Sequence, residues 1–288
     1  MRKLAFIAMT IAACWFAASR ANGAELRVPD KAVAGENLSI ATSGNGKGTL
    51  LLVGPGEVIK HDVRLGENAE IKGEELRHAG KWIAILRGGS PQSQVFWVEP
   101  GKPANLSFLA RPSRVPVNRP GVISGVAFTF DKFQNLVLQP SDVTFSLSVG
   151  GTSASHTTTT KDGVAFATSS SAKKAGAAQF VAKVGDSSVN RVVQQVASDP
   201  CNLRMRIVGR NKDEITVQTD PIHDCTGNPV PDGTIVTFIE TDKTGRSVVD
   251  ARIKKGIARA DLPASPKGHI SVASGVVLGN ELNVGGGE

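Results

Sequence analysis

The chain has 288 residues, and its 33 Lys and Arg against 26 Asp and Glu give a formal net charge of +7. After the first 24 residues the basic residues stand singly, apart from Lys173-Lys174 and Lys254-Lys255. This scatter excludes the clustered basic surface of a nucleic-acid-binding protein. The length favours two or three domains.

The first 24 residues have the layout of an export signal. Arg2 and Lys3 precede an uncharged run from Leu4 to Ala18, which small residues follow. That run of about 15 residues is shorter than the roughly 20 that a membrane-spanning helix needs. We predict a signal peptide over 1–24, cleaved after Ala21 or Ala24. The protein would then be periplasmic, cell-surface or extracellular, with no transmembrane segment in the remaining chain.

The three cysteines raise two separate questions. Ile11-Ala12-Ala13-Cys14 resembles the processing box of lipoproteins, but apolar residues continue beyond it, so a lipid anchor at Cys14 is the alternative to simple cleavage. The mature chain keeps Cys201 and Cys225. An even number of cysteines in an oxidising compartment predicts one disulfide between them, and two free thiols are the alternative.

The segment 25–99 is predicted to be a small β-sandwich, because short apolar runs alternate with turn residues throughout it. Trp82 and Trp97 lie in its last two predicted strands, where large rings can close a small core. An aromatic binding platform is the alternative. The Pro100–Pro103 stretch that follows is a predicted linker, since proline cannot donate to a sheet.

Residues 104–197 show period-two alternation most clearly, and each alternating set is predicted to face a core. The sets are Val126, Phe128 and Phe130; Val143, Phe145, Leu147 and Val149; and Phe180, Ala182 and Val184. The Ser/Thr-rich stretch 152–171 contains Val164-Ala165-Phe166. We therefore predict a pair of strands with a solvated Thr face there, rather than a disordered spacer.

The last segment, 200–285, repeats the segment before it at an offset of 93 residues. Turn residues and apolar residues stay in register together, which predicts two copies of one domain of about a hundred residues. The aligned pairs include Asp131 with Asp224, Asn135 with Asn228, Phe145 with Phe238, and Gly163 with Gly256. Phe145 and Phe238 are predicted to fill equivalent cores.

The predicted fold class is therefore all-β, with tandem immunoglobulin-like sandwiches over 25–99, 104–197 and 200–285. A second short linker falls near Ser198–Pro200. Because both linkers are short, we expect the three sandwiches to form a semi-rigid rod.

A block from Asp224 to Phe238 carries a family resemblance. It reads Asp-Cys-Thr-Gly-Asn-Pro-Val-Pro-Asp-Gly-Thr-Ile-Val-Thr-Phe and resembles the bacterial Ig-like group 1 domain of invasin- and intimin-type surface proteins. The resemblance is most specific over 200–284. In the preceding copy Gln134 replaces Gly227, and Leu-Val-Leu-Gln-Pro replaces Pro-Val-Pro-Asp-Gly, so membership there rests on the repeat.

The resemblance implies an Ig-like sandwich in an extracytoplasmic setting and carries no catalytic residue. The block itself supplies turn formers that fix φ and provide a left-handed position, so their predicted role is structural. These residues are Asn228, Pro229, Pro231, Asp232 and Gly233.

The same segment predicts where the disulfide lies. If Leu203–Val208 pairs with Glu214–Thr219 about a turn at Arg210–Lys212, Cys201 and Cys225 meet at the open end of the hairpin. Closing that loop of about 25 residues contributes roughly 3 kcal/mol in the chain-entropy description.

The sequence contains none of the short motifs that mark the common hydrolytic active sites. Neither G-x-S-x-G nor H-E-x-x-H is present, and the histidines lack metal-ligand spacing. We predict no catalytic residue, no cofactor and no metal. Carboxylates that meet only in space leave a glycosidase-type enzyme as an open alternative. The histidines are His61, His78, His156, His223 and His269.

These observations predict an exported, non-enzymatic protein of the cell envelope. It would act as a structural, adhesion or assembly module that binds another envelope or surface protein through loops or exposed strands. The alternative is a carbohydrate-binding accessory module. Aromatic residues at 5% and the absence of tyrosine disfavour that alternative, because such modules stack sugars on aligned rings.

Overall fold

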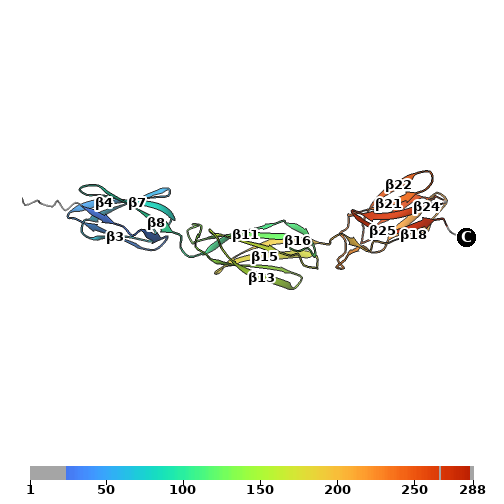
Figure 1. The fold of residues 1–288 in the computed structure, drawn as a ribbon, viewed down its shortest axis with the longest axis horizontal. Coiled ribbons are helices and arrows are strands. Elements are labelled where there is room, and N and C mark those ends of the chain that lie inside the picture. The colour runs from blue at the N-terminus through green and yellow to red at the C-terminus, as the bar shows by residue number, and fades with distance from the viewer. Residues whose placement is uncertain (1–23, 266, 286–288) are drawn as a thin grey trace, which may run out of the picture. The chain divides into compact units, whose positions relative to one another are not determined.

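The computed structural model describes residues 24–265 and 267–285, and all of their regular structure is β-strand. The predicted signal sequence up to Gly23, including Cys14, lies outside the described residues. The chain divides at Glu99 and Pro100 into two compact units (Figure 1). The predicted all-β class of tandem immunoglobulin-like sandwiches is confirmed.

The first unit is a sandwich of two sheets. Its smaller sheet has the order β1 (Glu25–Arg27), β3 (Leu38–Ser43) and β6 (Asn68–Ile71). The larger has the order β2 (Lys31–Val33), β8 (Gln92–Glu99), β7 (Gly80–Arg87), β4 (Lys47–Gly54) and β5 (Glu57–Arg64). The N-terminal segment is thus shared between the sheets, with β1 antiparallel to β3 and β2 parallel to β8.

The second unit begins with a sandwich of the same topology. Its smaller sheet has the order β14 (Val164–Ser169), β11 (Ile123–Phe130) and β9 (Asn105–Arg111). Its larger sheet has the order β10 (Arg114–Pro116), β16 (Ser187–Val196), β15 (Gly176–Val184), β12 (Asp142–Val149) and β13 (Thr152–Thr159). Every strand corresponds to the one numbered eight lower in the first unit. The shared strand order therefore relates 25–99 to the middle repeat. From the sequence, the two segments had in common only their short apolar runs and turn residues.

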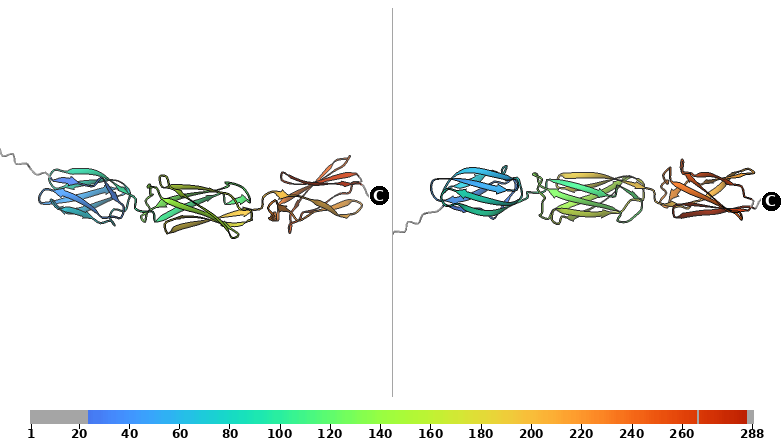
Figure 2. Two further views of the ribbon diagram at one scale, coloured as in Figure 1. Left: turned by 60° about the horizontal axis from the view of Figure 1, so that its bottom comes forward. Right: turned by 90° about the horizontal axis from the view of Figure 1, so that it is seen from above.

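The second sandwich of that unit has its own core. One sheet has the order β18 (Met205–Arg210), β19 (Glu214–Thr219) and β23 (Arg259–Pro263). The other has the order β22 (Arg246–Arg252), β21 (Ile235–Thr241), β24 (Gly268–Ser274) and β25 (Val277–Val284). A short ribbon pairs β17 (Pro200–Cys201) with β20 (His223–Asp224). The turned views show the two-layer arrangement in each sandwich (Figure 2).

Large side chains from both sheets fill each core. Phe145 and Phe238 are fully buried in separate clusters. In the first unit Trp82 is fully buried, whereas 54% of Trp97 is exposed. The prediction that both rings close the core is wrong for Trp97, because its neighbours Phe96 and Val98 take the two inward positions of β8.

The predicted inward face of β11 is also wrong. Ile123, Gly125 and Ala127 face the core, and the larger set of Val126, Phe128 and Phe130 is only half-buried on the outside. Two rings explain the choice: a Cβ on Gly125 would come within 2.8 Å of Phe180 and 2.9 Å of Phe108. Because core rings already occupy that space, the small residues of β11 must face inward.

The Ser/Thr-rich stretch does form two strands. They lie in different sheets, with β13 paired to β12 and β14 paired to β11, and so they do not pair with each other. The side chains of β13 are almost all exposed, which makes it the solvated Thr strand that the sequence predicts.

Candidate functional site

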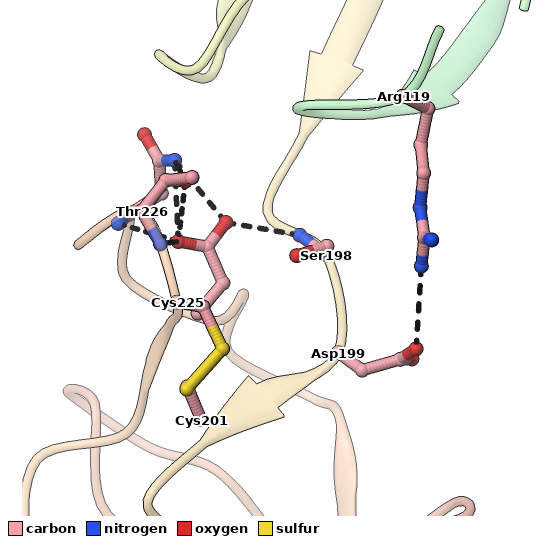
Figure 3. Close-up of a disulfide and its surroundings, with 8 residues drawn as sticks. Arg119, Ser198, Asp199, Cys201, Cys225 and Thr226 are labelled. Carbon is pink, nitrogen blue, oxygen red and sulfur yellow. Dashed lines mark hydrogen bonds and ion pairs between the residues drawn. A yellow bond between two sulfur atoms is a disulfide. The ribbon is translucent and has the colours of Figure 1, made fainter.

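Three of the predicted site residues of the last sandwich, Cys201, Cys225 and Asn228, lie near its junction with the sandwich before it. The β18–β19 hairpin pairs Met205 with Thr219, close to the predicted register, and a bulge interrupts it between Ile207 and Gly209. At its open end a disulfide joins Cys201 and Cys225, whose Cα atoms are 4.9 Å apart (Figure 3). The disulfide ties the strand that follows the linker to the loop beginning at Asp224.

The carboxylate of Asp224 organises this loop. It accepts hydrogen bonds from the backbone N–H groups of Thr226 at 2.8 Å and Asn228 at 3.0 Å, and from the Thr226 hydroxyl at 2.7 Å. Its second oxygen accepts the N–H of Ser198 at 3.1 Å (Figure 3). One buried carboxylate therefore holds both its own turn and the linker that enters the domain.

The electrostatics of Asp224 follow from these contacts. Burial alone would raise the pKa of this carboxyl, but hydrogen bonds from Thr226, Asn228 and Ser198 outweigh it and lower the pKa to about 2. Asp224 is consequently ionised across the neutral range, with its charge stabilised by donors rather than by a cation.

The preceding copy contains the same device at Asp131. Its carboxylate accepts the N–H groups of Phe133 at 2.8 Å and Asn135 at 2.9 Å, and the N–H of linker residue Gly101 at 2.9 Å. Burial raises the pKa of Asp131, and the bonds from Asn135, Gly101 and Phe133 lower it below its ordinary value. The sequence aligned Asp131 with Asp224 as a turn residue but gave no sign that each holds a linker.

Backbone bonds repeat at the same offset of 93 residues. Asp131 N–H donates to the carbonyl of Asn135 at 3.0 Å, and Asp224 N–H donates to that of Asn228 at 2.9 Å. The residue before each Asn has positive φ, 68° at Gln134 and 84° at Gly227. The two loops thus share one backbone conformation despite different sequences.

In the last copy the loop also reaches back to the sandwich before it. The Asn228 side chain donates to the carbonyl of Lys173 at 2.7 Å and accepts the N–H of Ala175 at 2.8 Å. The Thr226 hydroxyl lies 3.0 Å from the same Lys173 carbonyl and shares its one hydrogen between that carbonyl and the Asp224 carboxylate. Asn228, predicted as a turn former, therefore also bonds the two repeats together.

An ion pair lies beside these bonds. Arg119 and Asp199 approach to 3.9 Å with both side chains largely exposed (Figure 3). Exposed pairs of this kind contribute little free energy. The junction depends mainly on the Asp224 loop, the disulfide and the side chain of Asn228.

The remaining predicted turn residues have structural partners. Asp232 accepts the N–H groups of Lys255 at 2.9 Å and Gly256 at 3.1 Å, and these backbone bonds lower its pKa. Pro231 accepts the hydroxyl of Thr234 at 2.8 Å, and Gly233 has a φ of 91°. Pro229 forms an isolated bridge with His223.

Over 24–265 and 267–285 no three His, Cys, Asp or Glu side chains come together as a metal site would require. The same residues include no helix with the length and apolar character needed to cross a membrane. Two of the histidines lie instead against single glutamate carboxylates, His78 Nδ1 at 2.6 Å from Glu57 and His269 Nε2 at 3.3 Å from Glu281.

This chain resembles several proteins of known structure in its fold. The structure is similar to that of the Escherichia coli adhesin FdeC, with a TM-score of 0.61 and 17% identity over 92% of this chain and 98% of FdeC's. It is also similar to Yersinia pseudotuberculosis InvD, with a TM-score of 0.50 and 11% identity over 91% of this chain and 97% of that one. No family model and no curated protein matches the sequence. These likenesses show that this chain shares the fold of tandem Ig-like domains.

Proposed function

We propose that the protein is an exported, non-enzymatic module of the cell envelope that presents a binding surface to a protein partner. Its sandwiches over 25–99, 104–197 and 200–285 would serve as structural units of an adhesion-type protein. We further infer that the two repeats belong to the bacterial Ig-like group 1 family, on the strength of the block from Asp224 to Phe238.

The observation that carries this proposal is the bonded junction between the repeats. A spacer must hold its domains together, and here the Asn228 side chain bonds the preceding sandwich while Asp224 holds the linker between the two. The disulfide fixes the Asp224 loop that makes these contacts. The fold shared with an adhesin over nearly the whole of both chains supports the same reading. The disulfide suits an oxidising compartment, which supports export.

The proposal is tested in cells of the source organism that express the full chain with a C-terminal epitope tag. The expected result is a chain that begins at Asn22 or Glu25, lies outside the cytoplasm and is trapped by a cleavable cross-linker with a discrete partner protein. A chain lacking residues 1–24 is the control and is expected to stay in the cytoplasm without that partner. An unprocessed cytoplasmic chain, or an exported chain with no cross-linked partner, would contradict the proposal.

A further inference from the structure

The solvent face of the larger sheet in the first unit carries an apolar row across four strands. Val58 of β5 pairs with Val53 of β4, Val53 pairs with Ile83 of β7, and Ile83 pairs with Val95 of β8. Directly paired residues lie on the same side of a sheet, so the four side chains form one line about 14 Å long at the usual strand spacing. Val58 is 63% exposed and Val95 is 45% exposed.

Two further features widen this row into a surface. Leu51 and Ile85 pair on the same face in the next row and are half-buried. Trp97 is 54% exposed on the other side of the row. We call these seven side chains, Leu51, Val53, Val58, Ile83, Ile85, Val95 and Trp97, the apolar band.

Basic residues surround the apolar band. Trp97 lies between Lys31 and Lys81 in the sheet, and Lys60 lies opposite Leu51. Beyond the band, Lys47, Arg64 and Arg87 line an open hollow of about 570 Å³ together with Asp62. Among the described residues Lys47, Lys60, Lys81 and Arg87 form no ion pair. The acids on this face are Asp62 and Glu99, and Glu99 pairs with Lys31.

The fold does not require this composition. Lys47 lies directly opposite Arg64, which itself pairs with Glu67 at 3.4 Å, and like charges directly opposite each other destabilise a sheet. The corresponding face of the middle sandwich has the same strand order, yet β12 and β13 have hydroxyl residues at its centre: Thr144 pairs with Thr157, and Ser146 with Ser155. The next strand, β15, places Val181 beside Ser146. The apolar centre and basic rim of the first sandwich therefore do not follow from the strand order that it shares with the middle sandwich.

An apolar centre within a charged rim is the usual anatomy of a protein–protein interface, with an exposed aromatic residue as a common anchor. We propose that this face docks a protein partner whose contact surface has apolar side chains at its centre and carboxylates around them. A second copy of the chain would bring basic rim against basic rim, which opposes self-association. A membrane surface fits less well, because four of the seven apolar side chains are only partly exposed and would not reach into lipid.

This inference rests on the proposed function and specifies its partner. The mature chain contains Trp82, which is fully buried, and Trp97, so a change in emission on binding reports on Trp97. The test uses the mature full chain to select binders from a random-peptide phage library. A selected peptide is then synthesised and titrated while tryptophan emission is followed.

The expected binders mix acidic and apolar residues, shift the emission of Trp97 to shorter wavelength, and lose that shift in Trp97→Phe. Affinity is expected to fall at least tenfold in Lys60→Glu/Lys81→Glu. The control, Lys161→Glu/Lys243→Glu, changes net charge equally at exposed positions in the other unit and is expected to bind as the parent does.

Three outcomes would overturn the inference: binders without acidic residues, equal affinity in both charge-reversal variants, or an emission shift with phosphatidylglycerol vesicles that Lys60→Glu/Lys81→Glu abolishes. The last outcome would assign the face to a lipid surface. The same two variants distinguish this inference from the proposed function in cells. If the chain is exported and Lys60→Glu/Lys81→Glu still cross-links its partner, only the docking face is wrong.

Discussion

The loops at Asp131 and Asp224 have one architecture and two sequences. Both carboxylates accept the N–H groups of their own turn and of the incoming linker. Between the shared Asp and Asn, the middle copy has Lys-Phe-Gln and the last copy has Cys-Thr-Gly. The loop conformation therefore depends on the Asp and Asn, and the residues between them are free to take on other roles.

The last copy uses that freedom to strengthen a junction. Cys225 forms the disulfide, and the Thr226 hydroxyl and Asn228 side chain bond the preceding sandwich. In the middle copy Lys132 lies over the ring of Phe133 instead, 4.7 Å from its centre. Substitutions of residues that both copies share should destabilise both sandwiches equally. Substitutions of residues found only in the last copy should destabilise that sandwich alone.

The largest effect is expected in the cores, where the two copies should respond alike. Phe145→Ala and Phe238→Ala each remove a fully buried ring and are expected to cost about 3–5 kcal/mol of unfolding free energy in their own sandwich. Hydrogen exchange of peptides from each sandwich, measured in the full chain with denaturant, checks this. Unchanged protection in both variants would show that the two positions are not equivalent core sites.

Removing the disulfide should affect the last copy only. Cys201→Ser/Cys225→Ser opens a loop with a sequence separation of 24, and the chain-entropy description gives a loss of roughly 3 kcal/mol. Denaturant unfolding followed by hydrogen exchange should place that loss in 200–285 and leave 104–197 unchanged. As a control, unfolded and unreduced parent protein without its signal should not react with a thiol reagent. Reaction at either cysteine would contradict the bridge.

The stabilisation that Asp131 and Asp224 contribute to their sandwiches should depend on pH in the same way. The folded pKa of Asp224 is about 2, below its ordinary value of 3.8, so its contribution is complete above pH 4 and is lost as pH falls toward 2. Asp131, whose pKa is also lowered, should behave in the same direction. In Asp224→Asn we expect a loss on the order of 1–2 kcal/mol at neutral pH and a weaker decline of stability between pH 4 and 2. Denaturant unfolding across that range measures both, and an unchanged decline would remove Asp224 from this role.

Pattern and chemistry in the sequence predicted a good part of this molecule. The class of fold, the strands of the repeats and the pairing that brings Cys201 to Cys225 follow from alternation, turn residues and register. The alternating pattern gave the wrong inward face for β11, because it assigns the larger apolar side chains to the core. The rings of Phe108 and Phe180 leave room only for small residues beside Gly125. The pattern also could not show that Trp82 is buried and Trp97 exposed. In a strand whose residues are nearly all apolar, either alternating set of side chains can face the core.

The polar contacts between residues far apart in the chain could not be predicted from the sequence, for a different reason. The bond from Ser198 to Asp224 joins residues 26 positions apart, and a single Asp in a turn motif has a sufficient local explanation. The apolar band was hidden because its members come from four strands, each of which reads as an ordinary alternating run. Strand order was needed to bring them together.

The smallest expected effect concerns the residue just before Asn135 and just before Asn228, the turn asparagines that the two loops share. Gln134 adopts a φ of 68°, where a side chain costs roughly 1 kcal/mol, whereas Gly227 adopts 84° with no such cost. Gln134→Gly should therefore stabilise the middle copy by about 0.5 kcal/mol, because relief of strain exceeds the extra entropy of glycine in the unfolded chain. Gly227→Gln should destabilise the last copy by about 0.5 kcal/mol, the same balance of strain and unfolded-chain entropy with the sign reversed. A Cβ on Gly227 meets no atom within 4 Å, so no steric clash adds to this cost. Denaturant midpoints of the two sandwiches should move in opposite directions. Movement in the same direction would mean that the loops differ in conformation, and that their common pattern of hydrogen bonds does not determine their backbone.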